Sequence, residues 1–352
     1  MLIESLLVAT MIDFSLSLSV SVDVDSFARF KAGQPIHGET LQWLGADSAA
    51  SVALSSGKAV WLWGDTLVGS ISNASERLIV SMPRNSIAIA ASPTAPLDFY
   101  ARINHSNVHD QHTGFFTPAN QSNWLWLLTG FELQGELFLL GAEVTNAPGL
   151  PGFDFEIVGS VVVRVSNPND APHNWQWTLM SIPNTTSSET WNSAAVVDGE
   201  RIFVLGQTGQ FGATRLGHLS AGDVLRDDWS QIKVVQSALL SSFGPPETSL
   251  SFLAKLKRWA LFVVPYGTND LQIVLSPSSR LDDAAAWTVQ TIWQIALPYG
   301  DYPKVFCYAP KAHAELSNSS SIFLTFCSNT PKIDDLINAT DLYVPVPIRI
   351  NV

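Results

Sequence analysis

The chain has 352 residues and a formal net charge of −12 at pH 7, with 46% hydrophobic and only 14% charged residues. So few charged residues exclude a protein built from long amphipathic helices, and so many hydrophobic residues exclude a disordered chain. The acidic balance, without a cluster of Lys and Arg, excludes a nucleic-acid partner. An acidic, aromatic-rich chain suits instead a neutral substrate such as a sugar, whose CH faces stack on aromatic rings.

The first 22 residues allow more than one interpretation. Residues 6–12 are apolar, but no Lys or Arg precedes Arg29, so the positively charged start of a typical signal peptide is missing. The segment is therefore either a cleaved signal or the start of a trimmed gene model. Residues 15–25 alternate Ser or Asp with Leu and Val, which predicts a strand rather than a membrane span.

Five segments of roughly 60 to 70 residues then repeat one plan of short strands, which is a blade-sized period. With 12 Trp, 18 Phe, 22 Gly and 20 Pro, the composition is typical of many short strands separated by turns. The predicted strands cover residues 51–54, 59–63 and 86–90; 124–129, 137–142 and 159–165; 191–197, 201–206 and 214–219; 248–253, 259–264 and 271–276; and 303–309, 321–327 and 342–350.

The repeat predicts an all-β fold, a five-bladed β-propeller formed as a single domain by residues 23–352. Radial repetition of small sheets protects their edges and explains why helical patterns are missing. Closure requires the strand in residues 15–25 to join the last blade. A pair of two-layer sandwiches is the alternative, although no linker-like segment separates two halves.

Two features favour an extracellular glycoprotein. Asn-x-Ser/Thr sequons occur at Asn73, Asn104, Asn120, Asn184, Asn318 and Asn338. The two cysteines, Cys307 and Cys327, are equally distant from Ser317 at the centre of a polar turn. They should lie opposite each other on paired strands, which predicts a Cys307–Cys327 disulfide. The alternative is two buried free thiols.

Two aspartates are the main candidates for chemistry. A hairpin turn centred on Ser56 lies equally far from Asp47 and Asp65. If the strand ladder continues in register, the two side chains face each other with Cβ atoms roughly 5 Å apart. Retaining glycosidases need two carboxyl groups about 5 to 5.5 Å apart. The alternative is that Asp65 caps a turn and Asp47 is a solvated loop residue.

Three motifs around these aspartates resemble the five-bladed propellers of the endo-D-arabinanase-like family. They are Trp43-Leu-Gly-Ala-Asp47, Val60-Trp-Leu-Trp-Gly-Asp-Thr66 and Met82-Pro-Arg-Asn-Ser86. A looser similarity continues through residues 246–249, 258–259, 264–266 and 308–316, so it extends over most of the chain. The resemblance implies a glycoside hydrolase that cleaves furanosides with paired aspartates matching Asp47 and Asp65.

We assign Asp47 as nucleophile and Asp65 as acid/base, because Asp65 follows an apolar strand and desolvation raises the pKa of a carboxyl group. The reverse assignment is open. The expected substrate is an arabinan-like or other furanose-containing polysaccharide. A carbohydrate-binding propeller without turnover is the alternative function.

Further polar and aromatic residues are candidates for binding substrate. Arg84 and Asn85 return to the first blade, where they could orient one carboxylate or lower its pKa, and Arg84 could equally form a structural ion pair. Other candidates begin inner strands, could stack on sugar rings, or could bond hydroxyl groups; the alternatives are capping, core and surface roles. These residues are Glu39, Trp43, His112, Glu189, Trp191, Glu247, Tyr266 and His313.

No motif for a nucleotide, a zinc ion or a serine nucleophile occurs in the sequence. We therefore expect no cofactor. A structural calcium ion in the central channel is compatible with the sequence, although no ligand spacing specifies it.

Overall fold

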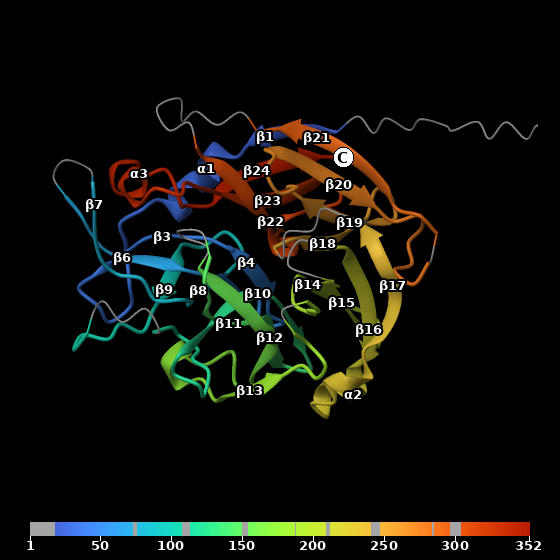
Figure 1. Ribbon diagram of the computed structural model, residues 1–352. Helices are drawn as coiled ribbons and strands as arrows, with labels where there is room; N and C mark the ends of the chain where they lie inside the picture. Colours follow the sequence, from blue (N-terminus) through green and yellow to red (C-terminus); the bar gives the residue numbers. More distant parts are fainter. Residues whose placement is uncertain are drawn as a thin grey trace, which may run out of the picture.

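The computed structural model describes residues 18–72, 76–107, 113–149, 154–186, 188–208, 212–240, 247–283, 285–295 and 304–352 (Figure 1). Helices within these ranges are short: α1 (Val24–Phe27), α2 (Ala221–Leu225), α3 (Ile333–Asn338) and the 3-10 turns Ala28–Phe30, Pro172–Asn174, Trp229–Gln231 and Ala314–Leu316. None of the described helices combines the length and apolarity that crossing a membrane requires. The predicted all-β class is confirmed.

The described strands form six sheets of four strands each, and every pairing between named strands is antiparallel. Three of the sheets follow chain order, from β10 to β13, from β14 to β17 and from β18 to β21. Their strands are β10 (Asn123–Leu133), β11 (Glu136–Asn146), β12 (Phe155–Val165), β13 (Trp177–Ser181), β14 (Ala194–Asp198), β15 (Arg201–Gln207), β16 (Thr214–Ser220), β17 (Lys233–Leu240), β18 (Ser249–Leu253), β19 (Arg258–Val263), β20 (Asp270–Leu275) and β21 (Thr288–Gln294).

The last sheet joins the two ends of the described chain. Its strands are β22 (Phe306–Ala312), β23 (Ser321–Asn329), β24 (Val346–Asn351) and β1 (Ser19–Val22). β1 pairs with β24, and Val22 lies opposite Ile348. The predicted closure by the N-terminal strand is therefore confirmed for β1.

In its first part the chain alternates between two sheets. One contains β4 (Ala50–Ala53), β5 (Ala59–Trp63), β8 (Ser86–Ala90) and β9 (Leu97–Tyr100); the other contains β2 (Gln34–Pro35), β3 (Gln42–Ala46), β6 (Thr66–Ile71) and β7 (Arg77–Ser81). Ala50 pairs with Leu62 in the first sheet and Ala46 with Thr66 in the second. Both pairs are symmetric about Ser56, so the predicted register holds on both sides of Asp47 and Asp65.

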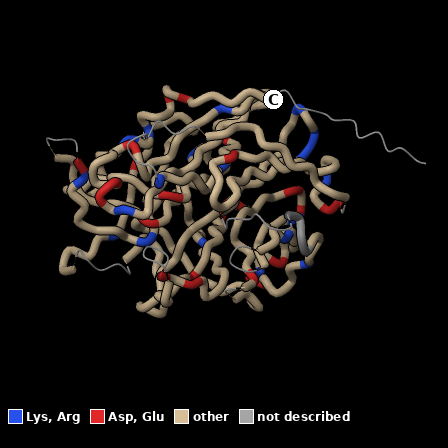
Figure 2. The backbone as a smooth tube through the Cα atoms, turned by 45° about the horizontal axis from the view of Figure 1, so that its top comes forward, with Lys and Arg blue, Asp and Glu red and all other residues tan. Residues whose placement is uncertain are grey.

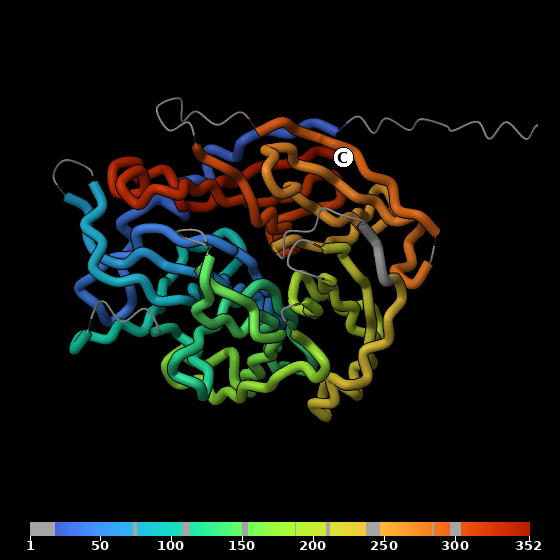
Figure 3. The backbone as a smooth tube through the Cα atoms, in the orientation of Figure 1, coloured from blue at the N-terminus to red at the C-terminus, as the bar shows by residue number. Residues whose placement is uncertain are grey.

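The sheets follow one another around a common centre, as the colour sequence in Figure 3 shows. The first strands of five sheets contact each other in a closed ring, because β4 lies against β10, β10 against β14, β14 against β18, β18 against β22, and β22 against β4. Radial repetition of four-stranded sheets is the arrangement of a propeller-type fold.

The core fills the spaces between successive sheets. Side chains from the second strands of neighbouring sheets share clusters, as Leu62 does with Leu139 and Phe262 with Leu324. Burying a large apolar side chain contributes about 1.5 to 3 kcal/mol, so these layers hold the ring together. Charged residues are instead spread over all parts of the chain, with both signs interspersed (Figure 2).

The predicted disulfide is wrong, because Cys307 and Cys327 are buried free thiols. Cys327 pairs with Tyr308, and Cys307 pairs with Ser328. An irregularity between Tyr308 and Lys311, where Ala309 has a φ of 51°, shifts the ladder of this hairpin. A shift of one residue turns a side chain to the other face of a sheet, so the two sulfur atoms do not meet.

Candidate functional site

Asp47 and Asp65 lie in the gap between the two sheets of the first region. Asp47 follows β3, and Asp65 lies between β5 and β6. Ser48 and Ala49 have φ values of 68° and 54°, a left-handed conformation that turns the chain from β3 into β4. Two such non-glycine residues cost about 1 to 3 kcal/mol each, and strain of this kind is concentrated at functional sites.

The carboxyl group of Asp47 is held by Tyr308 on β22 and by Tyr343 in the turn that precedes β24. Its Oδ2 accepts hydrogen bonds from the hydroxyl groups of Tyr308, at 2.9 Å, and Tyr343, at 3.1 Å. Its Oδ1 lies beside Gly64, where a Cβ atom would come within 2.2 Å of that oxygen. Glycine at position 64 therefore leaves the space that the Asp47 carboxyl group occupies.

Burial raises the pKa of Asp47 well above its ordinary value, and the negative charges of Glu247 and Asp65 raise it further. The two tyrosine hydroxyl groups act in the opposite direction, because hydrogen bonds to a carboxylate favour its ionised form. Asp47 therefore keeps its proton up to a higher pH than an ordinary aspartate does.

Asp65 has both oxygen atoms bonded to fixed donors. Arg84 donates from Nη1 to Oδ2 at 2.9 Å, and Trp126 donates from Nε1 to Oδ1 at 2.9 Å. Burial raises the pKa of Asp65, while the charge of Arg84 and the hydrogen bond from Trp126 lower it. Arg84 thus contacts one of the two carboxyl groups, as either an orienting residue or a structural ion-pair partner would. The side chain of Asp65 remains 18% exposed.

Glu247 joins the two aspartates to make a cluster of three carboxyl groups. It lies two residues before β18 and is partly exposed, while its Oε2 atom is buried without a hydrogen-bond partner in the described part of the chain. Burial raises the pKa of Glu247, the charge of Lys311 lowers it, and the charge of Asp65 raises it. The sequence suggested Glu247 only as a partner for sugar hydroxyls, whereas the structure places it with the predicted catalytic pair.

Two residues proposed to bind substrate are buried, and their polar atoms form hydrogen bonds within the protein. Asn85 is fully buried; its amide nitrogen donates to the carbonyl oxygens of Phe116 and Leu125, and its Oδ1 accepts from the backbone of Phe116. His313 is also fully buried and lies between Ser51 and Thr325, which bond its two ring nitrogens. Burial lowers the pKa of His313 to about 3, so it is neutral.

The prediction that Trp43 and Trp191 are aromatic platforms for a sugar is wrong. Trp43 is 1% exposed and packs against Trp63 and Phe99 in the core. Trp191 is 6% exposed, and the guanidinium group of Arg215 lies 3.8 Å from the centre of its ring. Their faces are therefore covered by the protein itself and do not offer a surface to a sugar.

The remaining predicted residues are Glu39, Glu189, Tyr266 and His112. Glu39 forms an ion pair with His105 at 3.0 Å, and Glu189 lies 3.5 Å from Arg215. Tyr266 is 67% exposed in the turn after β19, as a stacking residue should be. His112 lies outside the described residues.

Sequence reasoning missed the residues that hold the carboxyl groups. Tyr308 lies on β22, Tyr343 in the turn before β24, and Trp126 on β10. Trp126 is partly exposed, and Phe155 packs edge-on against it at 4.7 Å between ring centres. A partial signal existed for Tyr308, since it belongs to a motif already noted for its family resemblance.

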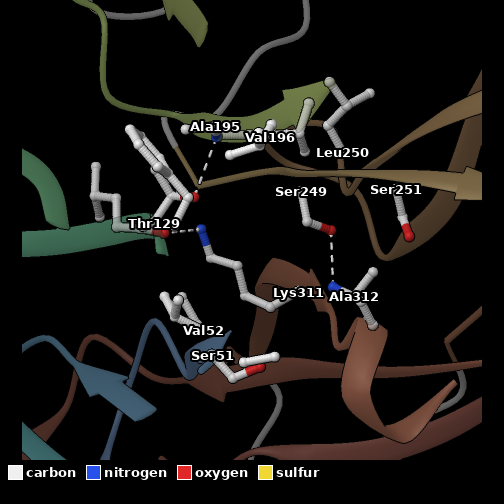
Figure 4. Close-up of a pocket in the computed structure, with 18 of the residues that line it drawn as sticks. Ser51, Val52, Thr129, Ala195, Val196, Ser249, Leu250, Ser251, Lys311 and Ala312 are labelled. Atoms are coloured by element: carbon white, nitrogen blue, oxygen red, sulfur yellow. Dashed lines mark hydrogen bonds between the residues drawn. The ribbon is translucent and has the colours of Figure 1, made fainter. Parts of the chain in front are cut away.

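A cavity of about 270 Å³ lies in the ring of inner strands (Figure 4). Lys311 lines it together with residues of β4, β10, β14 and β18. The ammonium group of Lys311 already donates to the carbonyl oxygens of Leu128 and Thr248, which are ligand types that calcium uses. Within the described ranges, no three His, Cys, Asp or Glu side chains are grouped to hold a metal ion.

Solved structures share this fold over most of the chain. One is a protein from Bacteroides ovatus ATCC 8483, provisionally described as a hydrolase, with a TM-score of 0.71 and 15% identity, over 95% of this chain and 90% of that chain. Another is a family 117 glycoside hydrolase from the marine bacterium Zobellia galactanivorans, with a TM-score of 0.52 and 9% identity, over 95% of this chain and 89% of that chain. At these identities the similarity establishes the propeller-type fold alone.

No curated protein matches this chain in sequence. A family model described as a domain of unknown function (DUF5005) matches residues 36–220, a segment that includes Asp47, Asp65 and Arg84. Since this segment is more than half of the 352 residues, the protein belongs to the DUF5005 family.

Proposed function

We propose that the protein is a glycoside hydrolase whose reaction takes place at Asp47, Asp65 and Glu247. The observation that carries the proposal is the cluster itself: Asp47 and Asp65 from the first region and Glu247 from beside β18 are all partly exposed and act on one another electrostatically. Like charges held together destabilise a fold, and such clusters in proteins mark sites of acid–base chemistry. The similarity in fold to a family 117 glycoside hydrolase supports the same class of reaction.

The contacts of the three carboxyl groups suggest different roles. Glu247 is the proton donor in this scheme, because its Oε2 has no described partner and burial raises its pKa. Asp65, with donors on both oxygens, orients the site as a fixed negative charge. This replaces the acid/base role that the sequence suggested for Asp65. Asp47 keeps its role at the anomeric carbon, because only its Oδ2 is bonded among the described residues.

In the proposed reaction, Glu247 gives its proton to the glycosidic oxygen as the bond between that oxygen and the anomeric carbon breaks. Asp47 either adds to the anomeric carbon, which leads to retention, or takes a proton from the water that adds there, which leads to inversion. The sequence predicted retention of the anomeric configuration, because Asp47 and Asp65 were expected to face each other. Retention remains a prediction. Proton NMR of the first product, recorded before mutarotation, distinguishes the two outcomes.

We further propose that the chain is a single five-bladed propeller, in which the sheet of β2, β3, β6 and β7 extends the first blade. The closed ring of five inner strands supports this count. The proposed substrate is a furanose-containing, arabinan-like polysaccharide, and the proposed location is extracellular. In support of glycosylation, Asn120, Asn184, Asn318 and Asn338 are all exposed.

A binding propeller without turnover is the second candidate. The ion pair between Arg84 and Asp65 favours it, because a carboxylate locked in this way is one feature expected of a non-catalytic site. In that case the protein should retain a glycan on an array without releasing any product from it.

The test is a screen of arabinans, galactans and fructans for released sugar, followed by substitution of the three carboxyl groups. Asp47→Asn and Glu247→Gln should each lower kcat by at least about 10²-fold, the contribution typical of a general acid or base. Asp198→Asn, in the turn between β14 and β15, provides a control that removes the same charge elsewhere. Hydrolysis that survives both Asp47→Asn and Glu247→Gln would refute the proposed site.

A further inference from the structure

Lys311 is a buried cation at the centre of the ring of inner strands. It lies on β22 and is 2% exposed. Figure 4 shows its side chain crossing the cavity towards β10. Its Nζ donates to the carbonyl oxygen of Leu128 on β10 at 2.8 Å and to that of Thr248 beside β18 at 3.0 Å. One ammonium group therefore connects three sheets.

Each of the three connected segments also carries a part of the carboxyl cluster. Thr248 directly follows Glu247. Leu128 lies two residues after Trp126, which bonds Asp65. Lys311 itself lies three residues after Tyr308, which bonds Asp47. The two hydrogen bonds of Lys311 thus fix the relative positions of the segments that carry Glu247 and the hydrogen-bond donors to Asp47 and Asp65.

The charge of Lys311 also acts on the cluster. Burial lowers the pKa of Lys311 to about 8, and Glu247, Cys327 and Asp47 are the groups whose charges oppose that effect. In the other direction, the charge of Lys311 lowers the pKa of Glu247. A positive charge near Glu247 and Asp47 reduces the repulsion between these two carboxyl groups.

We propose that Lys311 is a positioning residue that takes the place of a bound cation in the channel, holding the supports of Asp47, Asp65 and Glu247 in register and placing its positive charge near Glu247. The proposal rests on the proposed hydrolase function for its catalytic consequence. Its structural content, a protein-borne cation in place of a metal ion, does not depend on turnover.

The first test needs no activity. The titration of Glu247 is followed by ¹³C NMR with carboxyl-labelled glutamate, its signal being assigned by its loss in Glu247→Gln. In Lys311→Met the midpoint of Glu247 should move to higher pH, because a neighbouring positive charge is gone. Lys257→Met, in the turn at the other end of β18, removes the same charge and should leave the midpoint unchanged. An unchanged midpoint in Lys311→Met overturns the proposal.

The second test restores the ammonium group from solution. Lys311→Ala should melt at a lower temperature than the natural protein, and ethylammonium should raise that temperature with increasing concentration, as a ligand of the folded state does. The natural protein and Lys257→Met should not respond. A Lys311→Ala protein indifferent to the amine overturns the proposal, and a variant that folds only with the amine supports it.

The third test applies to a substrate found in the screen. Lys311→Met should lower kcat by about 10²-fold, as misplacement of reacting groups by about 1 Å does. It should also move the alkaline limb of the rate profile to higher pH, which a merely structural loss would not do. A full kcat with an unshifted alkaline limb overturns the proposal. If the natural protein hydrolyses none of the glycans, the proposed function fails, while the NMR and amine tests still decide the role of Lys311.

Discussion

The hydroxyl group of Tyr343 donates a hydrogen bond to Oδ2 of Asp47 across 296 positions of the sequence, at a distance of 3.1 Å. Tyr308 donates to the same oxygen at 2.9 Å. The last sheet and the turn that leads into its strand β24 thus supply two neutral donors to a carboxyl group of the first region. Closure of the ring is therefore a condition for the site as well as for the fold.

Removing either hydroxyl group should shift the pH at which Asp47 ionises. Hydrogen bonds from Tyr308 and Tyr343 lower the pKa of Asp47, so Tyr343→Phe and Tyr308→Phe should raise it. Because Asp47 must be ionised to react, the acid limb of kcat/KM should move to higher pH in both variants. Tyr100→Phe is the matched control, since Tyr100 donates to Asp98 at 2.6 Å outside the site. An acid limb unchanged in both site variants would contradict the role given to Asp47.

Asp47→Asn should stabilise the protein at neutral pH. The pKa of Asp47 is raised in the folded protein, chiefly by burial, so the unfolded chain loses its proton first as the pH rises. The contribution of Asp47 to stability is therefore full below its ordinary pKa near 4 and is lost as the pH rises towards the folded-state value. Asparagine can still accept from both tyrosines. Urea unfolding at pH 4 and pH 7 should show a gain of about 1 kcal/mol or more at pH 7 only. A gain of equal size at both pH values would show that ionisation of Asp47 is not the cause.

Gly64→Ala should remove activity with little loss of stability. Gly64 has no left-handed backbone angle, so alanine is tolerated locally, but its Cβ would lie 2.2 Å from Oδ1 of Asp47. The carboxyl group must rotate away from the two tyrosines, and displacement of a reacting group by about 1 Å can lower a rate 10²-fold. In Gly222→Ala, where the nearest atom is the end of the flexible Arg226 side chain, kcat should be unchanged. The measurement is kcat for both variants. A normal kcat in Gly64→Ala would contradict the role of the Asp47 carboxyl group in the reaction.

The register about Ser56 was predictable because a short, regular hairpin fixes which residues face each other. Ala50 opposite Leu62 and Ala46 opposite Thr66 both follow from it. The same reasoning failed for Cys307 and Cys327 for two reasons. The strand pair nearest the turn, Ala312 with Leu324, is centred on Asn318 rather than Ser317. The ladder is also irregular between Tyr308 and Lys311, and sequence does not show where a bulge will fall. A single displaced residue was enough to separate the two sulfur atoms.

Partners that meet only when the ring closes could not be predicted from local patterns. Glu247 was noted as the start of an inner strand, but its place beside Asp47 and Asp65 depends on how many sheets separate them. Trp43 and Trp191 were misjudged for the opposite reason, since tryptophan in a propeller usually fills the space between sheets, as both do here.

Arg77 should prove essential for holding Tyr343 against Asp47. It is 1% exposed, and its guanidinium group donates to the carbonyl oxygens of Leu44, Leu336, Ala339, Thr340 and Leu342. Leu342 directly precedes Tyr343, which has a left-handed φ of 58°, and Leu44 lies three residues before Asp47. Arg77 therefore ties the strand that carries Asp47 to the segment that carries its partner.

Lysine cannot reproduce this fork of donors, so Arg77→Lys leaves buried carbonyl groups without partners, each at a cost of about 1 to 3 kcal/mol. We expect a loss of at least about 2 kcal/mol in urea unfolding, together with an acid limb moved to higher pH as in Tyr343→Phe. Arg349→Lys is the control, because Arg349 is 34% exposed and its ion pair with Asp23 should contribute less than about 1 kcal/mol. If Arg77→Lys loses stability but keeps the natural acid limb, Arg77 supports the fold without positioning Tyr343.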